Sequence, residues 1–405
     1  MKKQILNLSL GLSIFSVFSF TTLSCRSRED EGTENVTTAI DPNNFKGEIK
    51  AGSTVTLDPS KIYKLTGKLL VENGATLIIP AGTRIVAEQG ANYLIVDRGG
   101  KLYVNGTASA PVIFEGKQHG QGYWGGIVIL GYAPTNRSAS GTSTSELGDL
   151  IYGGNNSQDN SGVLNYLIIK DSGFKYNPEK EFNGLSLFGV GSETQISNIY
   201  VVDGADDGIE CFGGSPNLKN IVIIGVGDDS FDWTEGYNGT VENLYAARKK
   251  VYQSAAEPGN RGIEADTQDT NPETTNGNGE SNPTLKNITL IGNSEGPESQ
   301  ALKIRAGSKG RMDNLVLANY NVGLDFETDR TYNWFTSGSR ITNVKMVNIN
   351  TVWKAKPTTN YPNPDLSSVF SINNSATGAG SGTSLPDWAK GWTGLTSFDI
   401  SDASN

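Results

Sequence analysis

Two short acidic segments carry the clearest chemical potential in this sequence of 405 residues. In each segment a pair of aspartates is followed, three residues after its second member, by another acid, and the segments are 22 residues apart. Their carboxylates belong to Asp206, Asp207, Glu210, Asp228, Asp229 and Asp232. If residues at this spacing are stacked on each other, the six groups come within two layers of the structure. Such a cluster is strongly repulsive unless a cation neutralises it.

Calcium is the cation that suits these ligands best, because Ca²⁺ takes about six to eight oxygen atoms from carboxylates and carbonyls. The sequence has one His and two Cys, so it does not favour a transition metal. Glu235 lies nearby and can extend the cluster. We expect the metal ligands to be Asp207, Glu210, Asp229, Asp232, Glu264 and Asp266. In the alternative interpretation, the aspartate pairs cap turns and the other acids are only solvated.

Two basic residues in a later segment, Lys303 and Arg305, suggest a catalytic alternative. In a polysaccharide lyase, a metal neutralises a uronate carboxylate and a basic side chain takes the α-proton. An inverting glycosidase instead uses paired carboxylates as acid and base. The catalytic residues of such an enzyme would be Lys303, Arg305, Asp207 and Asp229. In the opposing interpretation, the two basic side chains form salt bridges with acids of neighbouring layers, namely Asp325, Glu327 or Glu264.

Three aromatic residues close to the acids, Phe212, Trp233 and Tyr237, are candidates for stacking on sugar rings. They can equally pack the loops beside the cluster. Cys211 lies in the same run and is expected to face the core. The other cysteine is Cys25, and we expect no intramolecular disulfide framework, so stability has to come from packing.

An internal repeat supplies the elements that must position these residues. Residues 198–210 and 220–232 align without a gap, and each begins with an Asn followed by aliphatic residues. This first element recurs at Asn165, Asn198, Asn220, Asn243, Asn287, Asn314 and Asn343. One Asn at a fixed place in every coil can point inward and hydrogen-bond to the Asn of the next coil. The period therefore predicts the coils of a right-handed parallel β-helix with a buried asparagine ladder.

A second element of the repeat consists of a small residue, an apolar one and usually a charged one. Because side chains alternate across a strand, its middle residue should face the core and its third the solvent. The element occurs at residues 184–186, 208–210, 230–232, 262–264, 301–303 and 323–325. The 49 glycines and 3 methionines of the sequence also suit short strands and tight turns. The spacing between the two elements varies, which predicts lateral loops.

These patterns predict an all-β, pectate-lyase-like solenoid, a single-stranded parallel β-helix over residues 47–355. The tail at 356–405 loses the repeat and is expected to form a C-terminal cap or a flap along the side. The formal net charge of −10 argues against nucleic acid as a partner, since phosphate binding needs a basic footprint.

The N-terminal residues are typical of an export signal. Two lysines precede an apolar run that is too short for a membrane span, and the run leads into Cys25. Residues 1–24 thus resemble a bacterial lipoprotein signal peptide, which implies lipidation of Cys25, for example by palmitate. Residues 25–46 are expected to form a flexible tether, and the acids at 29–31 resemble a surface-export signal of Bacteroidota lipoproteins. The alternative is an ordinary secretory signal with a chance cysteine.

Several segments together resemble a family of β-helix envelope lipoproteins found in Bacteroidota and some Proteobacteria. They are residues 65–71, 124–131, 152–154, 160–164 and 228–232. The resemblance implies the fold and an outer-membrane, lipid-anchored location at the cell surface, but no activity.

Three functions remain open from the sequence. The first is a surface lipoprotein that binds a polysaccharide or another extracellular ligand through Ca²⁺, beside a TonB-dependent receptor. The second is a Ca²⁺-dependent polysaccharide lyase or glycosidase. The third is a scaffold or adhesin without catalysis, whose acids only keep it soluble.

Overall fold

The computed structural model describes residues 40–178, 180–249, 261–268, 277–293, 299–338 and 340–403. Contacts divide the chain into two compact units, Met1–Asn35 and Val36–Asn405, and all described residues belong to the second. The expected signal peptide and the lipidation at Cys25 lie outside the described residues. Within the described residues, no helix has the length and hydropathy needed to cross a membrane.

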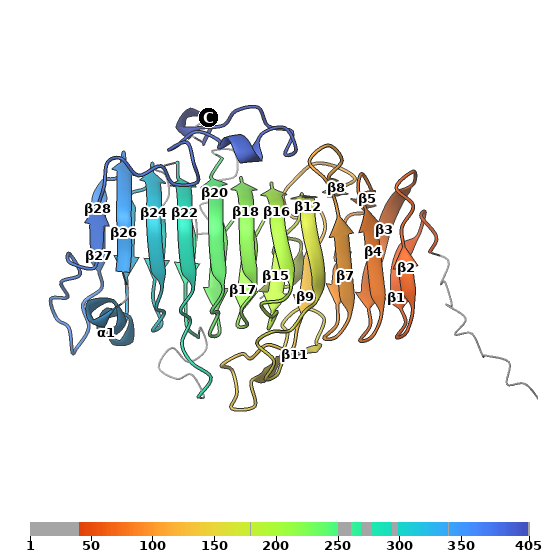
Figure 1. Cartoon of the computed structure of the whole chain (residues 1–405), viewed down its shortest axis with the longest axis horizontal. Coiled ribbons are helices and arrows are strands. Elements are labelled where there is room, and N and C mark those ends of the chain that lie inside the picture. The colour runs from red at the N-terminus through yellow and green to blue at the C-terminus, as the bar shows by residue number, and fades with distance from the viewer. Residues whose placement is uncertain are drawn as a thin grey trace, which may run out of the picture. The chain divides into compact units, whose positions relative to one another are not determined.

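The described part of the second unit is a parallel β-helix, which confirms the predicted fold. One sheet of 24 strands winds through it, and its neighbouring strands run in parallel (Figure 1). We call the first stack of strands the first column, and its members pair in the order β1 (Phe45–Ile49), β3 (Ile62–Val71), β6 (Leu94–Val96), β9 (Ile127–Leu130), β15 (Leu185–Phe188), β17 (Ile209–Phe212), β19 (Phe231–Thr234), β21 (Ile263–Ala265), β23 (Gln300–Ile304), β25 (Val322–Phe326) and β27 (Thr351–Ala355).

A second column of longer strands closes each coil. It stacks β2 (Thr54–Thr56), β4 (Thr76–Pro80), β7 (Lys101–Asn105), β12 (Gly162–Lys170), β16 (Gln195–Val202), β18 (Asn217–Ile224), β20 (Thr240–Ala247), β22 (Thr284–Ile291), β24 (Arg311–Ala318), β26 (Arg340–Val347) and β28 (Phe370–Ile372). Two shorter strands, β5 (Arg84–Ala87) and β8 (Val112–Gly116), form a third stack that merges into β12. The strand β28 lies beyond residue 355, where we expected the β-helix to end.

The repeat of the sequence matches the register of the strands. In the first column, Ile209 pairs with Phe231 and Glu210 with Asp232, so residues 22 apart are stacked as predicted. The middle residues of the second element are buried in one continuous apolar core, which also contains Cys211. The third residues point away from this core, because side chains alternate along a strand. The prediction that they face the solvent is wrong for Ser186, Glu264, Lys303 and Asp325, which are buried.

The asparagine ladder is confirmed along most of its length. Hydrogen bonds of 2.8 to 3.0 Å link the side-chain amides of successive rungs from Asn165 through Asn314. From Asn198 onward each Asn has a φ between 55° and 63°, the left-handed conformation that Asn tolerates well, and this bends the strand. From Asn165 to Asn314 these side chains are half-buried rather than buried as predicted, and Asn343 is exposed.

The two ends of the ladder differ from the prediction. In β12 the left-handed residue is Tyr166, and Asn165 pairs in register with Ser197, one position earlier than expected. At the other end, the Asn343 amide donates to the Asp313 carboxylate at 2.7 Å instead of to Asn314. The ladder is therefore a local hydrogen-bond pattern that other polar residues can continue.

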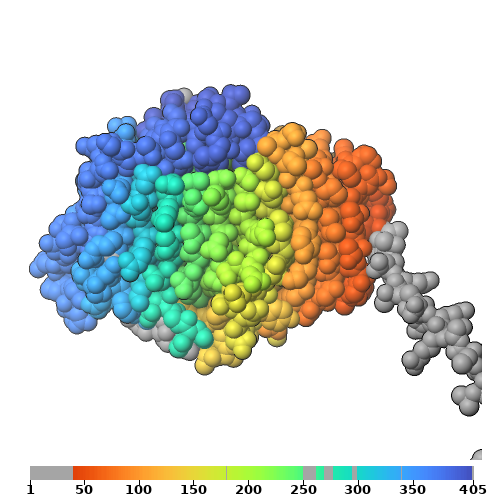
Figure 2. Space-filling model, viewed as in Figure 1, coloured from red at the N-terminus to blue at the C-terminus, as the bar shows by residue number. Residues whose placement is uncertain are grey.

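The tail after β28 lies along one side of the β-helix as a flap. Its apolar residues pack against the outer side of the second column, where Tyr200, Val222, Ile224 and Tyr245 form a separate buried cluster. Trp392 and Phe398 are among the covering residues, and the Tyr245 hydroxyl donates to the backbone of the tail. Figure 2 shows the tail as a ridge over the middle and later coils. This segment contains a 3-10 helix (Asp387–Ala389) and α2 (Ile400–Ala403).

Two hairpins and a helix project from the coils. The hairpins are β10 (Thr142–Thr144) with β11 (Ile151–Gly153), and β13 (Lys175–Asn177) with β14 (Lys180–Glu181). The helix α1 (Asp329–Ser337) follows β25. The hairpins contribute residues to a pocket at the acidic face, and α1 lies at the starts of the last strands (Figure 1).

Candidate metal and ligand site

The first column brings the predicted acids together. Glu210, Asp232 and Glu264 occupy the outward position of three successive rungs, in β17, β19 and β21. Their oxygens and those of the preceding aspartates form three groups, in each of which one oxygen per residue lies within 4.8 Å of the others. The groups are Asp206, Asp207 and Asp228, then Asp207, Glu210 and Asp232, and finally Asp229, Asp232 and Glu264. The acids predicted to converge therefore share one face.

Burial and mutual repulsion make the charged form of these acids unfavourable. Loss of solvation raises the pKa of the carboxyls well above the ordinary range, and the negative charges of neighbouring carboxylates raise it further. The affected groups are Asp206, Asp207, Glu210, Asp229 and Asp232. A bound cation would reverse this effect, because it would favour the charged form.

Hydrogen bonds account for part of the cluster. The Asp229 amide donates to Asp207 Oδ1 at 2.8 Å, so Asp207 caps the next turn, as the alternative interpretation expected. Asn183 Nδ2 donates to Glu210 Oε2 at 2.7 Å. Asp232 Oδ1 is buried and has no hydrogen-bond donor within the described part of the chain. A buried carboxylate oxygen without a donor is energetically costly, so Asp232 is the residue that most needs a cation.

Arginines neutralise the acids at the far edge of the cluster. Arg305 donates to Asp266 at 2.9 Å and to Glu264 at 3.0 Å. Arg261 lies 3.0 Å from Glu264 and 3.3 Å from Asp229. Three of the six expected ligands thus have cationic partners already. The candidate metal site is therefore centred on Asp207, Glu210 and Asp232.

Lys303 and Arg305 are held in salt bridges, as the non-catalytic interpretation predicted. Lys303 is only 5% exposed, and its amine lies 3.1 Å from Asp325 and also contacts Glu327. Arg305 is occupied by Glu264 and Asp266. In this geometry neither side chain is available to take a proton from a substrate.

The prediction that aromatic residues stack on a sugar is wrong for two of the three residues. Trp233 and Tyr237 are 0% exposed and belong to the core inside the coils. The Trp233 indole donates to Ser308 and the Tyr237 hydroxyl to Pro216, which satisfies their polar groups internally. Trp233 is buried because side chains alternate along a strand, so the residue after the outward Asp232 must face inward.

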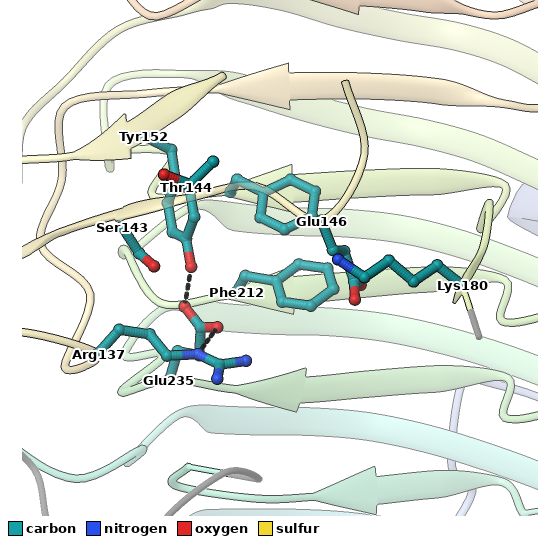
Figure 3. A pocket seen from close by; sticks show the side chains of 9 residues that line it. Arg137, Ser143, Thr144, Glu146, Tyr152, Lys180, Phe212 and Glu235 are labelled. Atoms are coloured by element: carbon teal, nitrogen blue, oxygen red, sulfur yellow. Dashed lines mark hydrogen bonds and ion pairs between the residues drawn. The ribbon is translucent and has the colours of Figure 1, made fainter. Parts of the chain in front are cut away.

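The third aromatic residue, Phe212, lines a pocket of about 280 Å³ beside the cluster. Phe212 is only 4% exposed, because it stacks on Phe188 with ring centroids 3.9 Å apart. The pocket is lined by Arg137, Ser143, Thr144, Glu146, Tyr152, Lys180, Phe188, Phe212 and Glu235. Figure 3 shows the two hairpins contributing its walls, with Lys180 and Glu146 on one side and Arg137 on the other.

Glu235 anchors one wall of this pocket and does not extend the acidic cluster. Its carboxylate accepts a hydrogen bond from Thr135 Oγ1 at 2.6 Å. It also accepts hydrogen bonds from Arg137 Nε and from the Tyr152 hydroxyl (Figure 3). Its φ of 58° is unusual for Glu, so these contacts hold a strained backbone. Burial raises the pKa of Tyr152, which therefore remains a hydrogen-bond donor.

Glu146 connects the pocket with the acidic cluster. It lines the pocket, and its charge contributes to the raised pKa of Glu210 and of Asp206. Sequence reasoning missed Arg137, Glu146, Tyr152 and Lys180, because they lie on a loop and on hairpins outside the repeat. A ligand in the pocket would have an aromatic floor, polar walls and the carboxylate cluster within reach.

Comparison with known proteins identifies the architecture. The family described as pectate-lyase like beta helix domain matches residues 47–393. Among solved structures, the chain is similar to the enzymatically active domain of tailspike protein 2 of bacteriophage CBA120, with 14% sequence identity and a TM-score of 0.30. The match covers 73% of this chain and 39% of that chain, so it spans well under half of the tailspike domain. No curated protein matches the sequence.

Proposed function

The chain belongs to the family of pectate-lyase-like β-helix domains, and we propose that it binds a glycan at its acidic face with the help of Ca²⁺. The ion would lie between Asp207, Glu210 and Asp232, and the adjoining pocket would hold a sugar ring. Ca²⁺ would supply a fixed positive charge for oxygen atoms of the ligand.

One observation carries this proposal. The Asp207, Glu210 and Asp232 oxygens lie within 4.8 Å of one another, and Asp232 Oδ1 is buried without a donor in the described residues. Elsewhere on the same column, carboxylates such as Glu264 and Asp325 are paired with arginine or lysine. The other acids of this column have basic side chains as partners. The acids without such a partner are best explained by a metal ion that neutralises them.

The pocket supports the choice of a glycan. A sugar ring presents an apolar face and a rim of hydroxyl groups, and the pocket offers Phe212 together with Ser143 and Thr144. The Lys180 amine has no ion pair or hydrogen bond among the described residues, so it can meet an oxygen of the ligand.

Calorimetric titration with CaCl₂ tests the metal site. Wild-type protein should bind Ca²⁺ and gain thermal stability. Glu210→Gln combined with Asp232→Asn should remove both effects, because two of the three central ligands lose their charge. Glu193→Gln is a suitable control, since Glu193 is exposed and lies outside the cluster. No heat and no thermal shift for the wild type would contradict the proposal and favour a scaffold or adhesin.

A polysaccharide lyase or glycosidase is the second candidate. The raised pKa of Glu210 and Asp232 would suit a proton donor. Binding without catalysis is better supported, because Lys303 and Arg305 are held in salt bridges. Incubation with uronic polysaccharides, followed at the absorbance of unsaturated products and by reducing-end release, separates the two. Product formation that depends on Glu210 would show that the protein is an enzyme and would overturn the proposal of binding without catalysis.

The proposed location is the outer membrane, through a lipid on Cys25, with the β-helix at the cell surface. Its support is the sequence pattern before Cys25 alone. Labelling of cells with a palmitate analogue should tag the wild type and not Cys25→Ser. Protease treatment of intact cells should remove the β-helix if it lies outside. Co-purification with a TonB-dependent receptor would support a role in uptake.

A further inference from the structure

A group of basic side chains lies outside the acidic cluster, where β22, β24 and β26 begin beside α1 (Figure 1). It consists of Lys286, Lys309, Arg311 and Arg340, which we call the basic patch. The patch stands out because the protein as a whole carries a formal charge of −10. A local excess of positive charge on an acidic protein points to a ligand with negative charge.

Two adjoining hollows form the surface of the patch. One has a volume of about 210 Å³ and is lined by Asn282, Lys309, Arg311, Trp334, Ser337 and Gly338. The other has a volume of about 250 Å³ and is lined by Thr284, Leu285, Lys286, Arg311, Met312, Asp313, Arg340 and Thr342. Arg311 lines both hollows, so its guanidinium can reach a ligand in either.

Arg311 is a cation without a protein partner. It is exposed, and no ion pair or hydrogen bond of its side chain occurs among the described residues. It also pairs in register with Arg340 on the next rung, about 4.8 Å away along the column. Two arginines stacked in this way repel each other unless an anion lies between or above them. The first column avoids such a pair by alternating Lys303, Asp325 and Lys354.

The neighbouring basic groups are held in place. Lys309 Nζ lies 3.6 Å from the centre of the Trp334 ring, and Arg340 Nη1 donates to the Phe335 carbonyl at 2.6 Å. The acids of the patch do not cancel its charge. Asp313 accepts hydrogen bonds from Thr342 and Asn343, and Glu280 lies 3.6 Å from Lys309. Glu242 pairs in register with Lys286, so four cations face three carboxylates.

We propose that the basic patch is a second, metal-independent binding site for an anionic polysaccharide, whose carboxylate or sulfate groups Arg311 contacts. Guanidinium binds both kinds of group through two parallel hydrogen bonds. Two adjoining hollows with one cation at their junction suit a chain of sugar rings with an anionic group between them. The site does not rest on the Ca²⁺ site, because it uses other strands and no carboxylate ligand.

The composition of the patch favours a polysaccharide over a lipid surface. A protein that binds a membrane through basic residues usually adds exposed apolar side chains. The exposed large hydrophobic residues of the described part are Ile62, Ile151, Val352 and Ile372, and none lines the patch. Nucleic acid is disfavoured because binding of closely spaced phosphates needs a larger basic footprint than these four side chains supply.

The experiment measures binding of heparin, polygalacturonate and neutral dextran in EDTA by affinity electrophoresis. The wild type should bind at least one of the two anionic polysaccharides and not dextran, more weakly as salt increases. Arg311→Gln should weaken binding about tenfold, because a hydrogen bond to a charged group contributes about that factor. Lys68→Gln removes an exposed charge near the other end of the β-helix and should change nothing.

The outcomes separate this proposal from the Ca²⁺ site. Absence of binding in EDTA, or equal binding by wild type and Arg311→Gln, would overturn it. Binding that needs Ca²⁺ would assign the polysaccharide to the acidic face instead. Sedimentation with vesicles of phosphatidylglycerol, without binding to either anionic polysaccharide, would replace the polysaccharide by a lipid. None of these results alters the calorimetric test with Ca²⁺ alone.

Discussion

The outward position of the first column carries Glu210, Asp232 and Glu264 on three successive rungs, and Lys303, Asp325 and Lys354 on the next three. In the later stretch the charges alternate in sign, and each acid has a basic neighbour. In the earlier stretch, arginines form ion pairs with Glu264, and within the described residues no ion pair involves Asp232 or Glu210. The same backbone thus supports a stretch of alternating charges and a stretch of negative charges.

This difference teaches how a β-helix separates stability from binding. Directly opposed side chains of opposite charge stabilise adjacent strands, and like charges destabilise them. The alternating stretch therefore contributes to folding by itself. The acidic stretch opposes folding unless a cation binds, so its cost is a sign of function.

The largest expected effect comes from breaking the alternating stretch. Lys303→Met leaves the buried Asp325 carboxylate with the half-exposed Lys354 as its cationic partner, and it removes the nearer of the two amines at Glu327. Loss of one partner of a buried ion pair lowers the free energy of unfolding by about 3 to 5 kcal/mol. Denaturant unfolding measures the change, with Lys68→Met as the control for loss of an exposed lysine. A change below about 1 kcal/mol would show that the alternating stretch adds little stability.

The next effect is a dependence of stability on pH in the acidic stretch. The folded-state pKa values of Asp207, Glu210 and Asp232 are raised, so the folded protein binds more protons than the unfolded chain above about pH 4. In EDTA, the free energy of unfolding should therefore fall as the pH rises from about 4 through the raised pKa values. Saturating Ca²⁺ should flatten this slope. A metal-free slope of the opposite sign would mean that these acids are compensated.

Replacing one acid by its neutral amide should increase the free energy of unfolding, whereas most substitutions decrease it. Asp232→Asn removes a buried charge whose Oδ1 has no donor in the described part of the chain. Without metal, the variant should be more stable than the wild type by about 1 to 2 kcal/mol. With Ca²⁺ the order should invert, because the variant loses a ligand. Thermal unfolding with and without Ca²⁺ measures both. Destabilisation in both conditions would remove the contrast between the stretches.

The smallest expected effect is at the rim of the alternating stretch. Lys354 also lies 3.1 Å from Asp325, but its side chain is 49% exposed. Lys354→Gln should lower the free energy of unfolding by only about 0.5 kcal/mol, since solvent screens exposed ion pairs. Added salt should reduce this difference further. An effect as large as that of Lys303→Met would show that exposure does not decide the strength of these pairs.

The sequence predicted the fold and the convergence of the acids because both follow from one period. Once residues 22 apart are stacked, Glu210 must face Asp232, and Ile209 must face Phe231. The same rule of alternation also places Trp233 inside, but we assigned it to the ligand from its proximity in sequence. The displacement at Tyr166 shows where the repeat itself misleads, because the neighbouring Asn165 imitates the motif.

The pocket could not be predicted from the period. Tyr152 and Glu235 are 83 residues apart and meet through a hairpin inserted between coils. The sequence likewise did not decide the role of the arginines that neutralise Glu264 and Asp266. It left both a salt bridge and a catalytic role open for Arg305. Side chains outside the repeat have no register, so only coordinates reveal their partners.

The flap after β28 also bears on how the protein is made. The flap follows the strands of the β-helix in the sequence, so a chain that is still being synthesised leaves the apolar cluster around Tyr200, Val222 and Ile224 uncovered until the flap is made. An incomplete chain therefore exposes an apolar flank, which is covered only when Trp392 and Phe398 pack against it. A truncated product that ends before Asn373 would leave this apolar surface permanently exposed. Quality-control proteases could recognise the truncated product by that surface.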